Sequence, residues 1–333
     1  MSKGGDGMKK IIVGGLIILL LLGVTVLYKY KNDDSTPTIQ LIDQVVLLNP
    51  SGPTVIPAIG LDAKEVTGEI NVSVQYWNNT DEVLASLAKN EAQFLVMPVS
   101  AGVNMYNQGM DIALLGVHGW KLFYLIARDG VEFADWNSMK GMNVYTPVGK
   151  GQTADVIMRA SFKEAGLEPG VDVNINYVPP QEIVALFKEG KIDFAALPEP
   201  FVTMAIQGGK GQVVLDFQEY WADMTGLNDR IPISGMFAAK QFLKEHPAET
   251  EKFVELFNKS IEWANENPDL AIEKSQDVLP VPPAIIKAAL ERIDFYFVPV
   301  QECQDEVNAY LTKIKEFDSE SISKVPDSEF YAK

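Results

Sequence analysis

The sequence predicts an α/β protein made of two similarly built lobes. Short β-rich runs alternate with helical patterns along most of the chain, which is typical of a largely parallel sheet covered by helices. The segment that begins at Asp81 is also repeated, in the order and spacing of its elements, by the segment that begins at Gln181. With 333 residues, of which 47% are hydrophobic, the chain can bury two moderate cores, which suits two lobes.

The expected elements follow from local pattern. Helical patterns lie at residues 81–90 and 181–190, and in the second of these Ile183, Val184 and Phe187 share one face. A longer helix is expected at residues 248–267, since Pro268 follows it. The expected strands are the β-rich runs at residues 39–48, 70–77, 94–99, 112–117, 122–127, 142–147, 173–178 and 193–198.

The internal repeat defines the two lobes. At a shift of 97 residues, Pro50 aligns with Pro147 and Gly52 aligns with Gly149. Each half therefore reads as strand, Pro-x-Gly turn, helix, strand, helix, strand and proline, which favours two units of one design. At a shift of 100 residues the identical pairs are Glu82 with Glu182, Ala85 with Ala185, Phe94 with Phe194, Pro98 with Pro198 and Gly109 with Gly209.

This arrangement predicts where a ligand binds. In open α/β sheets ligands bind beyond the carboxyl ends of the strands, so two such edges that face each other form a cleft. Trp77 and Trp120 are candidate ligand-binding residues because a ligand ring can stack on their side chains, although such aromatic side chains more often belong to a core. The candidate ligand-binding residues are Ser51, Gly52, Thr54, Trp77, Asn78, Pro98, Ser100, Trp120, Lys150, Gly151, Gln152, Thr153, Pro179 and Glu199.

The stretch YTPVGKGQTADV, at residues 145–156, sets the charge of the expected ligand. It lacks the nucleotide-binding pattern, because Val144 and Gly151 stand where that pattern needs a glycine and a Ser or Thr. Its free N–H groups and Lys150 suit an oxyanion at the start of a helix. Two alternatives stay open: Asp155 can itself use the helix dipole, and Glu199 suits an amine or a heterocycle N–H instead.

The N-terminus predicts a membrane anchor. Residues 11–28 are uncharged and would span about 27 Å as a helix, close to the thickness of a bilayer core. Lys9 and Lys10 precede this run, which places residues 1–10 in the cytoplasm and the bulk of the chain on the extracytoplasmic face of the cell membrane. Residues 29–38 form a polar tether. A cleaved signal peptide is the alternative, but no small-residue cleavage site follows the run.

Composition excludes several classes of function. Residues 33–333 carry 23 basic and 44 acidic residues, a net charge of −21 that would repel nucleic acid. Cys303 is the single cysteine, so no disulfide framework or thiolate metal site is expected. His118 and His246 are the two histidines and lie far apart in sequence, so we expect neither a metal nor a cofactor.

The succession of segments resembles the substrate-binding proteins of ABC importers, in the branch of sulfonate, taurine, nitrate and thiamine-precursor binders. The resemblance covers about residues 39–315 and rests on WNNTDEVLASLAKNEAQFLVMPVSAGVNMYNQG, HGWKLFYLIAR, DWNSMKGMNVYTPVGKGQTADVIMR and VPPQEIVALFKEGKIDFAALPEPFVTMAI, followed by HPAETEKFVELFNKSIEWANENPDLA. It implies a type II periplasmic-binding-protein-like fold, a hinge, and a ligand delivered to a permease driven by an ATPase.

The resemblance also implies lobe boundaries and leaves the ligand open. The first lobe would comprise residues 39–127 and 237–333 and the second residues 128–236, with crossings near 127–130 and 231–237. The ligand would be a sulfonate or other oxyanion, or a thiamine-precursor-like heterocycle. No cysteine before Cys303 can carry a lipid, so the uncleaved anchor would hold the protein beside its permease.

Two other functions compete with ligand delivery. A pyrimidine-synthase-like enzyme of this fold needs histidines and cysteines clustered around iron, which two histidines and one cysteine do not supply. A ligand-sensing ectodomain needs a cytoplasmic output domain, whereas ten residues are expected inside. The sequence therefore favours a binding protein rather than an enzyme.

Overall fold

The computed structural model describes residue 42, residues 44–89 and residues 91–333 of the chain. The expected cytoplasmic segment, anchor and tether, at residues 1–38, lie outside the described residues. Within the described part of the chain, no helix has the length and apolar character needed to cross a membrane.

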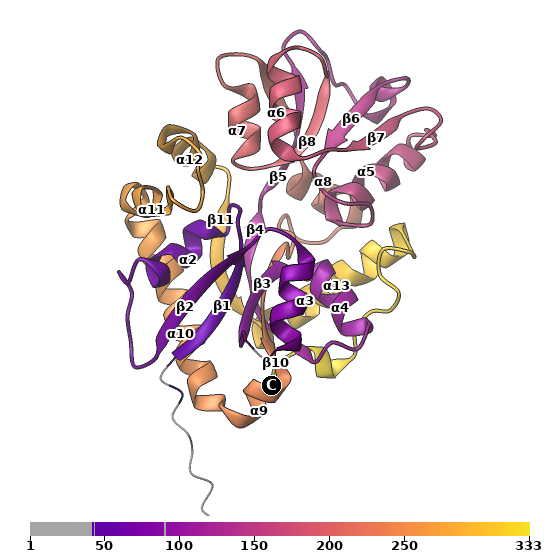
Figure 1. Cartoon of the computed structure of the whole chain (residues 1–333). Coiled ribbons are helices and arrows are strands. Elements are labelled where there is room, and N and C mark those ends of the chain that lie inside the picture. The colour runs from indigo at the N-terminus through magenta and orange to yellow at the C-terminus, as the bar shows by residue number, and fades with distance from the viewer. Residues whose placement is uncertain (1–41, 43, 90) are drawn as a thin grey trace, which may run out of the picture. The chain divides into compact units, whose positions relative to one another are not determined.

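The first sheet has six strands in the order β11-β4-β10-β3-β1-β2 (Figure 1). Strand β1 is parallel to both β2 and β3, whereas β10 is antiparallel to β3 and β4. The mixture arises because β10 comes from a distant part of the chain and enters in the opposite direction. The bounds are β1 Gln44–Pro50, β2 Asn71–Trp77, β3 Phe94–Pro98, β4 Ile112–Lys121, β10 Ser234–Ala239 and β11 Asp294–Pro299.

The second sheet has five strands in the order β7-β6-β8-β5-β9. Strand β6 is parallel to β7 and β8, and β5 is antiparallel to β8 and β9. We call each sheet with its helices a lobe, the first lobe being built on the six-stranded sheet. The bounds are β5 Phe123–Arg128, β6 Asn143–Thr146, β7 Asn174–Tyr177, β8 Phe194–Pro198 and β9 Gly211–Asp216.

Helices connect the strands and cover the sheets (Figure 1). Helix α10 is the long helix expected from the sequence, and it packs on α2. The bounds are α2 Val55–Asp62, α3 Thr80–Ala88, α4 Val99–Asn107, η1 Trp136–Met139, α5 Thr153–Glu164, α6 Pro180–Lys188, α7 Phe201–Ile206, α8 Phe217–Thr225, α9 Lys240–Glu245, α10 Pro247–Glu266, α11 Pro268–Ser275, α12 Pro283–Leu290, α13 Val300–Phe317 and η2 Ser328–Phe330.

The structure confirms the internal repeat. Strands β3 and β8 occupy positions 94–98 and 194–198, and helices α3 and α6 occupy positions 80–88 and 180–188, at the shift seen in the sequence. The order β2-β1-β3-β10-β4 in the first sheet corresponds to β7-β6-β8-β5-β9 in the second, with the same parallel and antiparallel pairings. Both lobes therefore present the carboxyl ends of three parallel strands.

The chain passes from the first sheet to the second at Leu122, between β4 and β5. The expected boundary at residues 127 and 128 falls inside β5, whose pairing with β8 and β9 places it in the second lobe. Residues 121–123, where the chain passes between the sheets, contain no glycine or proline, so no turn residue marks the passage. Gln218 of α8 holds it, because its Oε1 accepts the N–H of Phe123 at 3.2 Å and its Nε2 donates to the Phe123 carbonyl at 3.0 Å.

The return passage lies in residues 226–233, between α8 and β10. Arg230 fixes this segment: Nη2 lies 2.6 Å from Glu306 Oε2 on α13, and its guanidinium lies 4.3 Å above the Trp120 ring. The side chain of Glu306 raises the pKa of Arg230, so the guanidinium stays charged. Both passages are therefore held by polar side chains of neighbouring helices rather than left as free loops.

Candidate functional site

Three polar atoms converge on the carboxyl ends of the parallel strands of the first lobe. Asn49 lies at the end of β1, Trp77 ends β2, and Ser100 follows β3 in the first turn of α4. Within the described residues, Asn49 Oδ1, Trp77 Nε1 and Ser100 Oγ are buried without a hydrogen-bond partner. Because buried polar groups are nearly always satisfied, these atoms are candidates for hydrogen bonds to a ligand at this edge.

The turn after β1 shapes this edge. The N–H of Ser51 donates to the Trp77 carbonyl at 2.9 Å, which ties the turn to the end of β2. Thr54 is buried, and its Oγ1 accepts from Asn49 Nδ2 at 3.3 Å. Gly52 has open space where a Cβ would stand. Ser51 is exposed, so the sequence-predicted turn presents Ser51 and Gly52 outward and uses Thr54 to position Asn49.

The second lobe meets α13 at the same edge. Thr153 Oγ1 at the start of α5 lies 2.6 Å from Tyr310 Oη on α13, and Ser100 is a further neighbour of that hydroxyl. Burial raises the pKa of Tyr310 to about 12, so it remains a neutral phenol at physiological pH. Tyr310 thus joins Thr153 of the second lobe to the neighbourhood of Ser100 in the first. Tyr310 was not among the candidates predicted from the sequence, because the residues around it form an ordinary amphipathic helix and no functional motif.

A cavity of about 430 Å³ brings together residues of both lobes. The first lobe contributes α3 and α4, the second lobe contributes the loop before α5, and the segment after α13 closes one side. Four of the predicted site residues, Ser100, Lys150, Gly151 and Gln152, line it. The other lining residues are Leu84, Ala101, Asn104, Met105, Gln108, Arg159, Asp318, Glu320 and Ser321.

The loop before α5 already holds an anion of its own. The N–H of Gly151 donates to Asp155 Oδ2 at 2.7 Å, and Tyr177 Oη donates to Asp155 Oδ1 at 2.6 Å. Arg159 Nε lies 3.2 Å from Asp155 Oδ2, and Arg159 also pairs with Asp318. The structure therefore shows the alternative in which Asp155, rather than a ligand, accepts the N–H at the start of α5. Lys150 is exposed and also lines the cavity.

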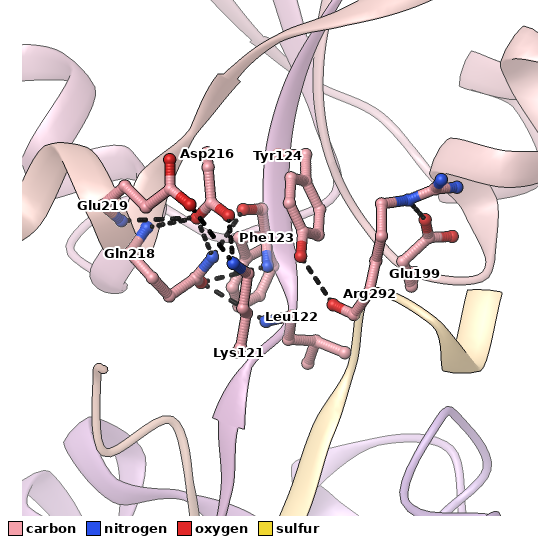
Figure 2. Close-up of polar contacts among 9 residues, drawn as sticks. All are labelled: Lys121, Leu122, Phe123, Tyr124, Glu199, Asp216, Gln218, Glu219 and Arg292. Atoms are coloured by element: carbon pink, nitrogen blue, oxygen red, sulfur yellow. Dashed lines mark hydrogen bonds and ion pairs between the residues drawn. The ribbon is translucent and has the colours of Figure 1, made fainter. Parts of the chain in front are cut away.

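Glu199 has protein partners rather than a free carboxylate. Figure 2 shows Arg292 reaching it, with Arg292 Nε 2.6 Å from Glu199 Oε1. The N–H of Thr203 donates to Glu199 Oε2 at 3.0 Å, and Glu199 is completely buried. Burial raises the pKa of Glu199, while the bonds from Thr203 and Arg292 oppose this rise. The expectation that Glu199 binds a ligand amine is corrected, because its oxygens are taken by Arg292 and Thr203.

Trp120 is also corrected. It is completely buried in β4, its Nε1 donates to the Tyr296 carbonyl at 3.0 Å, and Arg230 covers its ring. Its faces are therefore unavailable for stacking with a ligand. Asn78 and Pro179 are exposed at strand ends and Pro98 is half-buried. The N–H of Asn78 donates to Glu82 Oε2 at 2.9 Å, which is a turn contact.

The chain is similar to proteins of known class over most of its length. The model of the NMT1-like family matches residues 72–279. The Bacillus subtilis protein named "Putative aliphatic sulfonates-binding protein" is 21% identical over 243 residues, 71% of this chain and 69% of that protein. The B. subtilis protein named "Putative binding protein YtlA" is 22% identical over 51% of this chain and 49% of its own length, so the chain spans about half of that relative.

Solved structures share the fold. An ABC transporter protein from Parabacteroides distasonis superimposes with a TM-score of 0.70 at 22% identity, covering 87% of this chain and 99% of that one. The periplasmic aliphatic sulphonate binding protein SsuA from Escherichia coli gives a TM-score of 0.71 at 17% identity, covering 87% and 92%. The expected periplasmic-binding-protein-like architecture of two α/β sheets is thereby confirmed.

Proposed function

Because the chain belongs to the NMT1-like family, we propose that it is an extracytoplasmic solute-binding protein that captures a small molecule between its lobes and delivers it to an ABC importer. The partners would be a permease and the ATPase that drives it. The names of the similar proteins, which include an ABC transporter protein and sulfonate-binding proteins, support this class of function. The ligands that these names print belong to those proteins, and the similarity does not assign one of them to this chain.

One observation carries the proposal. The unpaired Asn49, Trp77 and Ser100 lie at the carboxyl ends of parallel strands, where ligands of open α/β sheets bind. The cavity of about 430 Å³ that Ser100 lines receives residues from both lobes, and its volume falls within the range of about 300–1,000 Å³ that suits small molecules. A site shared by two lobes can hold a solute more firmly when the lobes close.

A screen for stabilising solutes tests this function. The full chain in detergent is heated with single sulfonates, nitrate, pyrimidines, flavins and amino acids. A true ligand at 100 times its dissociation constant stabilises the fold by about 2.7 kcal/mol, which raises the unfolding midpoint. We expect Trp77→Phe, which removes the unpaired N–H, to weaken that binding, whereas Trp263→Phe on α10 serves as the matched control. Failure of every solute class to raise the midpoint would contradict the proposal.

We also propose that residues 11–28 anchor the protein, with residues 1–10 in the cytoplasm and residues 29–38 as a tether. This arrangement would keep the binding lobes beside the permease without a lipid. Protein taken from cell membranes should then keep its first ten residues and need detergent for release. A mature N-terminus near Lys31 in the growth medium would instead show a cleaved signal peptide.

A further inference from the structure

The cavity shared by the lobes offers hydroxyl groups that lack partners. Ser100 and Ser321 both line it and are only 3% and 6% exposed. Ser321 Oγ has no hydrogen-bond partner among the described residues, and Ser100 Oγ neighbours the Tyr310 hydroxyl without reaching hydrogen-bond geometry. Ser321 Oγ also faces the loop before α5, since it would stand 3.4 Å from a Cβ placed on Gly151. Two buried hydroxyls from different parts of the chain therefore point to a ligand that can both donate and accept hydrogen bonds.

Asp155 lies directly behind the wall of this cavity that Gly151 and Arg159 form. Its side chain is completely buried; it accepts hydrogen bonds from the Gly151 N–H and the Tyr177 hydroxyl and forms an ion pair with the Arg159 guanidinium. A helix N-terminus, a phenol and a guanidinium are the donor set that would hold a bound carboxylate, sulfonate or phosphate. The anion position at the start of α5 is thus filled by the chain itself.

We propose that Asp155 sets the charge specificity of the cavity, so that it admits an uncharged polar solute and rejects oxyanions. This inference rests on the proposed solute-binding function. An oxyanion at the Gly151 loop would have to stand beside a buried carboxylate, and like charges in a poorly solvated place repel strongly. Two of the donors that would compensate it, the Gly151 N–H and the Tyr177 hydroxyl, already donate to Asp155, and the third, the Arg159 guanidinium, forms ion pairs with Asp155 and Asp318.

The remaining charges of the cavity do not reverse this preference. Arg159 pairs with both Asp155 and Asp318, so two carboxylates balance its single positive charge, although its Nε and Nη2 have no aligned hydrogen-bond acceptor among the described residues. Lys150 is exposed, where water and salt screen its attraction for an anion. Glu320, another lining residue, adds a negative charge. An uncharged solute that carries hydroxyl or amide groups matches the unpaired serines without opposing these carboxylates.

The test compares sulfate and ethanesulfonate binding by the full-length wild type, Asp155→Ala and Asp155→Asn, using calorimetry and thermal shift in detergent. The wild type should show no saturable binding of either anion. Asp155→Ala vacates the anion position and should bind sulfate at least about 10-fold more tightly. The sulfate would accept the hydrogen bonds that the Asp155 carboxylate accepts in the wild type. Adding Tyr177→Phe to Asp155→Ala removes one donor and should reduce that gain.

Glu164→Ala is the matched control, since Glu164 is an exposed carboxylate of the same helix and its loss changes the net charge equally. It should gain no anion binding. Wild-type binding of ethanesulfonate that is unchanged in Asp155→Asn would overturn the proposal, and this variant keeps the size of the side chain and so preserves the fold. If the wild type bound no solute of any class, the proposed function would fail, whereas anion binding gained by Asp155→Ala would still place Asp155 at the anion position.

Discussion

At the scale of single residues, two kinds of buried polar group bear on the site. Asp155 and Glu199 have all their close partners supplied by the protein, and these partners hold the loops in which they lie. Asn49, Trp77 and Ser100 keep an unpaired atom at one edge of the first sheet. Because leaving a buried donor or acceptor unpaired costs about 1–3 kcal/mol, the second kind is expected where a ligand restores the missing bonds.

His118 gives the stability a defined pH dependence. It is completely buried in β4, with Nε2 3.3 Å from Ser234 Oγ and its ring packed edge-on against Phe257. Burial lowers the pKa of His118 to about 3. The unfolded chain takes up this proton below about pH 6.5 while the folded chain does not. The stability that the neutral ring provides is therefore complete above pH 6.5 and is lost as the pH falls toward 3.

We predict that this histidine alone lowers the free energy of unfolding by about 2 kcal/mol between pH 7.5 and pH 5. His118→Gln keeps a hydrogen-bonding side chain opposite Ser234 but cannot take up the proton. Urea unfolding at the two pH values should therefore show a smaller loss for the variant than for the wild type. Equal losses in both proteins would mean that His118 is protonated in the folded state.

At the scale of elements, much of the fold could be predicted from the sequence, because the strands and helices of the repeat carry their own patterns. The runs expected at residues 94–99 and 193–198 became β3 and β8, and the helix expected at residues 248–267 became α10. These segments are apolar on the faces that they bury, so local periodicity was sufficient. Strands β9, β10 and β11 were not expected. Only β10 is rich in glycine and alanine, whereas β9 and β11 are short runs of β-branched and aromatic residues that lie outside the repeat on which the prediction rested.

The site was less predictable, because it depends on contacts between distant segments. Among the candidate residues, Ser100, Lys150, Gly151 and Gln152 line the cavity, Trp77 ends β2 with its N–H unpaired, and Thr54 and Thr153 contact Asn49 and Tyr310; their binding of a ligand stays a prediction. The partner of Glu199, however, is Arg292, which no local pattern connects with it. Trp120 is likewise covered by Arg230 from the other passage. Only the tertiary structure shows which polar residues are already engaged.

At the scale of the whole molecule, the two lobes contact each other at separate places. Thr153 meets Tyr310 of α13, a helix that also packs against β4 of the first sheet. Glu199 meets Arg292, which lies between α12 and β11. Figure 2 shows this ion pair on the opposite side of β5 from Lys121 and Asp216, whose charged atoms lie 2.6 Å apart. Opening the lobes would break such contacts, so a solute that bridges both lobes would favour the closed form.

The distance between the lobes in solution tests the central claim most directly. Fluorescent labels can be placed on Val171→Cys in the second lobe and Glu273→Cys on α11 in the first, both exposed positions. Cys303 can stay, because burial raises its thiol pKa to about 11 and leaves it unreactive. A saturating solute should shift single-molecule energy transfer to a shorter, narrower distance distribution, and Tyr310→Phe should reduce this closed population. A distribution that saturating solute leaves unchanged would contradict capture by closure of two lobes.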